Sequence, residues 1–201
     1  MTTETTSTSG RGLTPSQTVG PFFHYCLTPA AYGYPEVVTN DLLTEDAAGE
    51  RIRIEGRVFD GDGQPVPDAM IEIWQADGQG RYAHPADAGA RLNTRFKGFG
   101  RAECDAEGRY RFTTVKPGPV PGPNGRAQAP HINVGVFARG VLNRLFTRIY
   151  FEDEAGNASD PIFALVPEEA RGTLIARRSG AAAYTFDIHL QGTNETVFFE
   201  A

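Results

Sequence analysis

The 201-residue sequence has few cysteines, no cluster of positive charge and no long apolar run. Its two cysteines, Cys26 and Cys104, are too few and too far apart for a disulfide framework or a zinc-finger pattern. The formal net charge is −6, and without a basic block neither nucleic acid nor an anionic membrane is a natural partner. No run approaches the roughly 20 apolar residues of a membrane span, and the opening MTTETTSTSG does not resemble a secretion signal. We therefore expect a cytoplasmic protein with free thiols.

The residues that are abundant favour short strands. The chain has 23 glycines and 14 prolines, a turn-rich composition, and 40% of its residues are hydrophobic. RIRIEGRVFD, which begins at Arg51, alternates charged with apolar residues, which is typical of a strand with one buried face. We predict further strands in AMIEIWQA, GRYRFTTV, HINVGVFA, LFTRIYFE, AYTFDIHLQG and ETVFFE. The prediction is a mainly β, single-domain β-sandwich with long irregular loops.

The remaining segments divide the chain into three parts. Residues 1–12 are mostly Thr, Ser and Gly and predict a flexible arm. Residues 13–50 mix Pro, Gly and aromatics without a period and predict an extended segment that lies against another surface. Residues 51–201 form the sandwich. Only PEEARGTLIARR, from Pro167, has the proline, acidic start and basic end of a short helix.

Four regions contain residues that could carry chemistry. They are Tyr82 in GQGRYAHP, the proline-rich KPGPVPGPNG, the pair His131 and Asn133 in APHINV, and Arg139 in FARG. Strand side chains alternate, so His131 and Asn133 share one face of the predicted strand. Taken singly, each region has an ordinary structural explanation: a loop aromatic, a hydrogen-bonded histidine, a solvated arginine.

The order of these regions resembles the core of the intradiol ring-cleaving dioxygenases. GRVFDGDGQPVPDAMIEIWQADGQGRY, then KPG, then APHI follow one another as in that family. The resemblance implies a β-sandwich whose active members hold one non-haem Fe(III) with two tyrosines and two histidines and cleave a catechol between its hydroxyls. Phenolate and imidazole ligands suit this hard cation.

Carried over residue by residue, the resemblance leaves the ligand set incomplete. The first tyrosine falls on Tyr82 and the first histidine on His131, but Val120 and Asn133 stand where the second tyrosine and second histidine would be. Gln128 stands where active chains carry an arginine. We therefore expect no catalytic residue and no metal ligand set in this chain, and Tyr82 and His131 to remain as a hydrogen-bonded remnant.

The longer segments TPSQTVGPFFHYCL, PHINVGVFARGVLNRLFTRIYFEDE and YTFDIHLQGTNETVFFE resemble the iron-free chain of a two-chain member of the family. That resemblance implies a large hetero-oligomer in which a homologous β subunit holds Fe(III) and cleaves a carboxylated catechol with O2. It also implies that Gly20, Pro21 and Arg139 help to form the substrate pocket. The aromatics Phe22, Phe23 and Tyr25 and the C-terminal VFFEA are the predicted interface, poorly covered on a lone chain.

Two alternatives remain open from the sequence. The chain could be a self-sufficient metal-dependent catechol dioxygenase that uses Tyr82, His131 and an additional ligand such as His84. It could instead be a non-catalytic β-sandwich binding module that shares only the scaffold. For Arg139, the structural alternative is an ion pair with one of the acids at 152–154.

Overall fold

The computed structural model describes residues 18, 20–87, 89 and 94–200. The predicted flexible arm, residues 1–12, lies outside the described residues. In the described part, no helix is long and apolar enough to cross a membrane.

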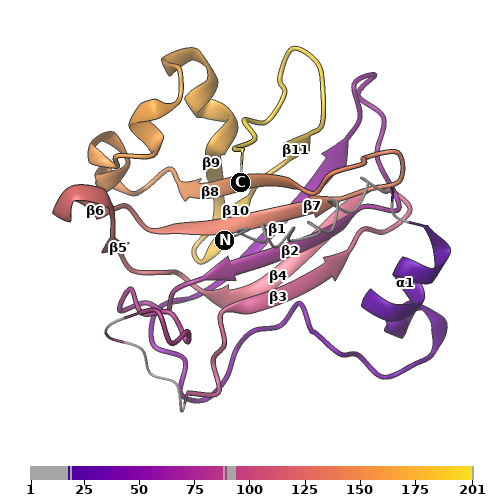
Figure 1. The fold of residues 1–201 in the computed structure, drawn as a ribbon, viewed down its shortest axis with the longest axis horizontal. Helices are drawn as coiled ribbons and strands as arrows, with labels where there is room; N and C mark the ends of the chain where they lie inside the picture. The colour runs from indigo at the N-terminus through magenta and orange to yellow at the C-terminus, as the bar shows by residue number, and fades with distance from the viewer. Residues whose placement is uncertain (1–17, 19, 88, 90–93, 201) are drawn as a thin grey trace, which may run out of the picture.

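A continuous sheet folds over into two layers (Figure 1). One layer contains β4, β1, β10 and β9, with β11 added beside β1, and the other contains β3, β2, β7 and β8. Parallel pairing of β9 with β8 joins the two layers. The strands are β1 Arg51–Phe59, β2 Met70–Gln75, β3 Phe99–Glu103, β4 Arg109–Val115, β7 His131–Phe137, β8 Leu145–Phe151, β9 Ile175–Gly180, β10 Ala183–Thr185 and β11 Ile188–His189, with a separate hairpin of β5 Val120–Pro121 and β6 Ala127–Gln128.

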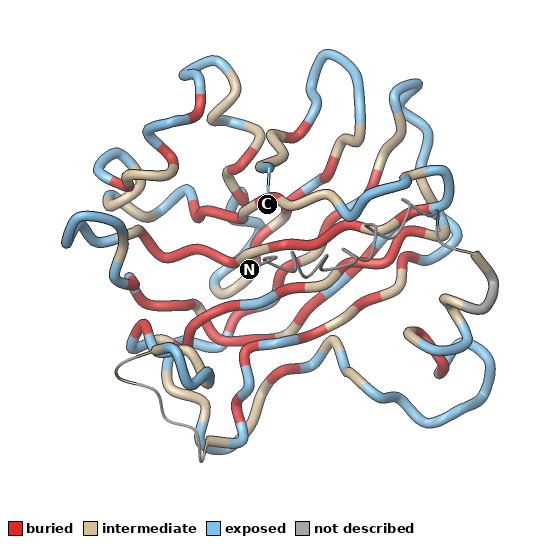
Figure 2. Tube along the Cα trace, viewed as in Figure 1, coloured by how far each residue is buried: buried red, intermediate tan, exposed pale blue. Residues whose placement is uncertain are grey.

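The core lies between the two layers. Alternate residues of β1 are buried and face this core, and buried residues, drawn in red in Figure 2, are frequent along the strands in the middle of the molecule. Its members come from both layers and form one cluster: Ile52, Ile54 and Val58 of β1, Phe112 of β4, Ile71 and Ile73 of β2, and Ile132, Val134 and Val136 of β7. The predicted mainly β sandwich is confirmed, and so are the predicted strands that correspond to β1, β2, β4, β7 and β8.

The predicted helix from Pro167 is wrong in its second half. Residues Glu168–Leu174 form a 3₁₀ helix, η5, and the chain then enters β9. Ile175 pairs with Tyr150 and Ala176 with Phe151, so pairing with β8 overrides the helical pattern. Further short 3₁₀ helices are η1 Pro29–Tyr32, η2 Pro123–Gly125, η3 Ala155–Ser159 and η4 Phe163–Leu165.

The segment before the sandwich is not wholly extended. Pro21–Leu27 form α1, which begins with proline after an extended Gly20. Arg101 of β3 holds the end of this helix, because its guanidinium donates to the Leu27 carbonyl (3.1 Å) and to Glu72 of β2 (2.6 Å). The aromatic rings of Tyr25 and Tyr32 remain largely exposed beside each other.

The C-terminal segment is better covered than the sequence predicts. Val197 and Phe199 pack against one buried cluster and Phe198 against the main core. Thr147 donates to the Val197 carbonyl (2.7 Å), and Phe199 donates to the Phe146 carbonyl (2.7 Å). The prediction that VFFEA is uncovered on a lone chain is therefore wrong for these three residues, and ETVFFE forms a bridge to β8 rather than a strand.

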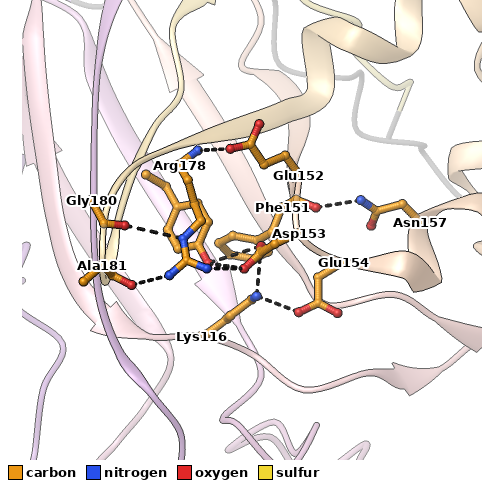
Figure 3. A network of polar contacts seen from close by, with 10 residues as sticks. Lys116, Phe151, Glu152, Asp153, Glu154, Asn157, Arg178, Gly180 and Ala181 are labelled. Carbon is orange, nitrogen blue, oxygen red and sulfur yellow. Dashed lines mark hydrogen bonds and ion pairs between the residues drawn. The ribbon is translucent and has the colours of Figure 1, made fainter.

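A polar network closes the edge where the two layers meet (Figure 3). Lys116, just after β4, forms ion pairs with Asp153 (3.1 Å) and Glu154 (2.6 Å), just after β8. Tyr184 of β10 also donates to Asp153 (2.9 Å). Burial lowers the pKa of Lys116, but hydrogen bonds to Glu154 and Asp153 outweigh it, so that the pKa is raised and the lysine stays charged.

Candidate functional site

The first and third residues of β7, His131 and Asn133, face away from the core. Ile132 is fully buried in the core, whereas His131 and Asn133 on either side of it line a pocket. The predicted alternation is therefore confirmed. Asn133 pairs with Trp74 of β2 and with Arg148 of β8, so Trp74, Asn133 and Arg148 form a row across three neighbouring strands.

The loop that follows β2 forms another wall of the pocket. Gly80 has φ +73°, and a Cβ there would lie 2.0 Å from the Pro119 carbonyl oxygen, so only glycine fits. Gly118 donates to the Asp77 carbonyl (2.9 Å), which ties this loop to the proline-rich turn. Tyr82, from this loop, and Val120, from the β5–β6 hairpin, consequently line the same pocket.

This open pocket has a volume of about 480 Å³, in the range of small-molecule sites. The four positions that the resemblance assigns to metal ligands, Tyr82, Val120, His131 and Asn133, all line this pocket, and so does Gln128. The lining residues are Trp74, Arg81, Tyr82, His84, Ala86, Asp87, Val120, Pro121, Gln128, His131, Asn133 and Arg148.

His131 is a neutral imidazole. Its Nδ1 lies 2.7 Å from the Ala129 carbonyl oxygen, which can only accept, so Nδ1 carries the proton and Nε2 is the acceptor. Burial and then the positive charge of Arg148 lower the pKa of His131 to about 4.

Tyr82 is a protonated phenol. Burial raises its pKa above the ordinary value, and a hydrogen bond from Asn133 and the charge of Arg148 offset this only in part. The Asn133 amide donates to the Tyr82 hydroxyl (3.4 Å) and to the Trp74 carbonyl (3.3 Å). Tyr82 and His131 thus each have a polar partner, as predicted for a remnant, although the partners are Asn133 and Ala129 rather than each other.

Arg148 places a fixed positive charge in the pocket. Its Nη1 donates to Gln128 Oε1 (2.8 Å) and lies 3.4 Å from the Tyr150 hydroxyl. A guanidinium stays protonated throughout the physiological pH range.

These residues do not fit Fe(III). Val120 has no donor atom, Asn133 directs its NH2 group toward Tyr82, and the Tyr82 phenol is not ionised at neutral pH. The Arg148 charge would repel a cation in the same space. In the described residues, no group of three or more His, Cys, Asp and Glu side chains could hold a metal ion. His84 also lines the pocket, but its Nδ1 already accepts from the Ala86 amide (3.2 Å).

The other predicted residues lie in two segments beyond the opposite end of β7. Gly20 precedes α1, Pro21 opens it, and Arg139 follows β7. Gly140 donates its amide to the Thr18 hydroxyl (2.7 Å), which joins the two segments. The Arg139 guanidinium forms an ion pair with Asp68 (2.7 Å), so the predicted alternative partner at 152–154 is wrong. The Arg139 side chain is nevertheless 74% exposed.

The length of β7 separates the two groups of residues. His131 begins this strand and Phe137 ends it, a rise of roughly 20 Å at about 3.3 Å per residue. In Figure 1 the β5–β6 hairpin and α1 accordingly lie at opposite ends of the molecule. Arg139 therefore cannot serve the pocket of its own chain.

Comparisons with known proteins agree with this architecture. A family model described as dioxygenase matches residues 18–192. The chain belongs to the dioxygenase family. It is 46% identical over 196 residues to the protocatechuate 3,4-dioxygenase alpha chain of Burkholderia cepacia, covering 93% of this chain and 96% of that one.

Two further dioxygenases are similar to the chain. The protocatechuate 3,4-dioxygenase beta chain of Burkholderia cepacia is 42% identical over 171 residues, covering 80% of this chain and 73% of that one. The solved dioxygenase domain of a dioxygenase carbohydrate-binding protein fusion from Streptomyces sp. SirexAA-E is 25% identical, with a TM-score of 0.58 over 89% of this chain and 98% of that one.

Sequence reasoning missed Arg148 and the pocket roles of Trp74 and Arg81. The signal for Arg148 was available, because β7 and β8 are consecutive antiparallel strands, and a hairpin register sets Arg148 opposite Asn133. Arg81 depends on the course of an irregular loop, which no periodic pattern specifies.

Proposed function

We propose that this chain is the iron-free alpha-type subunit of a protocatechuate 3,4-dioxygenase. Its partner would be a homologous β subunit that holds Fe(III), in a large cytoplasmic hetero-oligomer. The complex would cleave protocatechuate (3,4-dihydroxybenzoate) with O2 to 3-carboxy-cis,cis-muconate, with the partner's metal activating the substrate toward oxygen. The similarity of this chain to both the alpha and the beta chain of protocatechuate 3,4-dioxygenase supports this assignment.

The observation that carries the proposal is that Val120 and Asn133 stand where the resemblance expects two metal ligands, in a pocket that also contains the Arg148 guanidinium. A chain that performed the reaction alone would need three or four protein ligands for a mononuclear site. The pocket has two candidate donors from the family set, Tyr82 and His131, and both are neutral. The self-sufficient enzyme is therefore disfavoured.

We further propose that Gly20, Pro21 and Arg139 contribute to the partner's substrate pocket. Arg139 is exposed on a segment that Thr18 joins to the region of Gly20. A forked guanidinium suits the ring carboxylate of protocatechuate, directly or through water. Gly20 has an extended backbone, and a Cβ added there would meet no atom within 4 Å, so packing inside this chain does not require glycine.

We also propose that two parts of the chain have different roles. Residues 51–201 would form the dioxygenase sandwich, and residues 13–50 would form the segment that meets the partner. The exposed aromatics Tyr25, Tyr32 and Tyr34 support this role.

Co-expression with a β chain tests the assignment. The full-length chain, tagged, should retain the β chain on purification, and the complex should take up O2 with protocatechuate. Failure to co-purify with any iron-bearing homologue encoded in the same genome, together with inactivity of the mixture, would contradict the proposal.

The role of Arg139 has a matched control. In the complex, Arg139→Ala should raise the KM for protocatechuate at least about tenfold, because a charge-assisted hydrogen bond is lost. Use of a catechol without the carboxylate should change much less. Asp68→Asn removes the ion pair of Arg139 but keeps the guanidinium, so it should leave the substrate preference intact. Equal losses on both substrates in Arg139→Ala would contradict the role.

A further inference from the structure

The Arg148 guanidinium has no direct carboxylate partner among the described residues. Asp160 reaches it only through the Tyr150 hydroxyl, which donates to the Asp160 carboxylate (3.3 Å). That carboxylate already accepts from the backbone amides of Ala129, Ile162 and Phe163. Arg81, the other arginine of this pocket, faces Asp87 at 4.0 Å, whereas Arg148 has no ion pair among the described residues. Its contacts are the neutral Gln128 and Tyr150 side chains, and both involve Nη1. Nε and Nη2 of this half-buried side chain have no hydrogen-bond partner among those residues. A guanidinium in this state favours an anion.

The acidic residue on the rim does not supply that anion. Asp87 accepts hydrogen bonds from the backbone amides of Tyr82 (2.8 Å) and Gly89 (2.7 Å). These contacts lower the pKa of Asp87, with the Tyr82 amide as the largest cause, and Arg81 adds to the effect. The Asp87 carboxylate is therefore already stabilised by hydrogen bonds within its own loop and by Arg81.

The remaining walls suit a planar ring. Trp74, Tyr82 and His84 form an aromatic group, with ring centroids of Tyr82 and His84 5.7 and 5.6 Å from that of Trp74. Trp74 is 43% exposed, and it lies two strands from Arg148 in the same cross-strand row. Partly exposed aromatic faces beside a cation provide both apolar area and a partner for a carboxylate. Val120 adds an apolar wall to the pocket. A polar side chain at this position could hydrogen-bond to Arg148 in place of the ligand.

We propose that this pocket is a non-catalytic binding site for a small aromatic carboxylate, with its carboxylate on Arg148 and its ring against Trp74 and Tyr82. The site belongs to this chain, lies about 20 Å from Arg139 along β7 at about 3.3 Å per residue, and does not depend on the proposed function.

Tryptophan fluorescence offers a direct test, because Trp74 is the only tryptophan of the chain. The full-length chain is titrated with sodium benzoate, with excitation on the red edge of the tryptophan band where benzoate does not absorb, and neutral benzamide serves as the uncharged probe. We expect a saturable change with benzoate and at least about tenfold weaker binding of benzamide.

Two variants remove the free charge in different ways. Arg148→Gln deletes the guanidinium. Asn133→Asp places a carboxylate of nearly the same shape opposite Arg148, so that the protein supplies its own anion. Both should weaken benzoate binding at least about tenfold, whereas Arg53→Gln, an equal charge change at an exposed position of β1, should not. The absence of a saturable change in the wild-type chain, equal binding of benzamide, or unchanged binding in a folded variant of either kind would overturn the proposal.

Discussion

Lowering the pH should destabilise the fold through His131. The residue is 3% exposed, donates from Nδ1 to the Ala129 carbonyl and has a folded pKa of about 4. In the unfolded chain its pKa returns to the ordinary 6.5. Between these values the unfolded chain binds a proton that the folded chain excludes, so stability is fully present above pH 6.5 and is lost as the pH falls toward 4.

The size of the effect follows from the two pKa values. At about pH 7 both states are mostly unprotonated at His131. At about pH 5 the unfolded state is protonated and the folded state is not, which lowers the free energy of unfolding by about 2 kcal/mol relative to neutral pH. Carboxyl groups with depressed pKa values, such as Asp87 and Asp153, act mainly below this window, because their ordinary value is 3.8.

Urea unfolding at neutral pH and at about pH 5, at one protein concentration, measures the effect. His131→Gln cannot take up the proton, so it should lose about 2 kcal/mol less than the wild-type chain between the two pH values. Arg148→Gln removes one cause of the low pKa and should give an intermediate loss. Equal losses for the wild-type chain and His131→Gln would refute the reasoning.

Two further predictions concern the sandwich itself. Tyr110→Phe removes a buried hydrogen bond to the Phe186 carbonyl and should cost about 1–3 kcal/mol in urea unfolding, so unchanged stability would contradict a role for that contact. Lys116→Met keeps the apolar stem but leaves Asp153 and Glu154 without their shared cation, and it should cost a similar amount, about 1–3 kcal/mol, partly restored when the pH is lowered enough to protonate Asp153. A loss that does not depend on pH would show that packing, not charge, is responsible.

The parts of the fold that the sequence predicts are those in which one local pattern decides. β1 alternates buried residues with more exposed ones along its whole length, and the alternation of Arg and Glu with Ile and Val predicts this arrangement. β3 escapes prediction because FGRAE is short and contains glycine and charges, and it exists through its pairing with β2. The segment IARRSG, which forms β9, lacks the alternation of apolar residues that is typical of a strand, so its first residues fit the pattern of the predicted helix. The register of β9 comes from its pairing with β8 and β10.

The candidate site likewise has parts that the sequence predicts and parts that it does not. The face shared by His131 and Asn133 follows from strand geometry alone, while the placement of Tyr82 and Val120 beside them depends on the family resemblance. The position of Arg148 could be predicted from the pairing of β7 with β8. Its lack of a direct ion pair among the described residues could not, because a sequence does not show which neighbours a side chain lacks. Arg139 is predicted to act together with Gly20, and the Thr18 to Gly140 hydrogen bond agrees with that prediction, although its role toward a substrate remains a proposal.

Iron content tests the central claim most directly. The full-length chain should be purified alone and, separately, after co-expression with its β partner, and iron per chain should be measured together with O2 uptake on protocatechuate. The account predicts no iron and no uptake for the lone chain, and one iron for each pair of chains, with uptake, in the complex. Stoichiometric iron and activity in the lone chain would contradict it, because Val120, Asn133 and Arg148 would then have failed to exclude the metal.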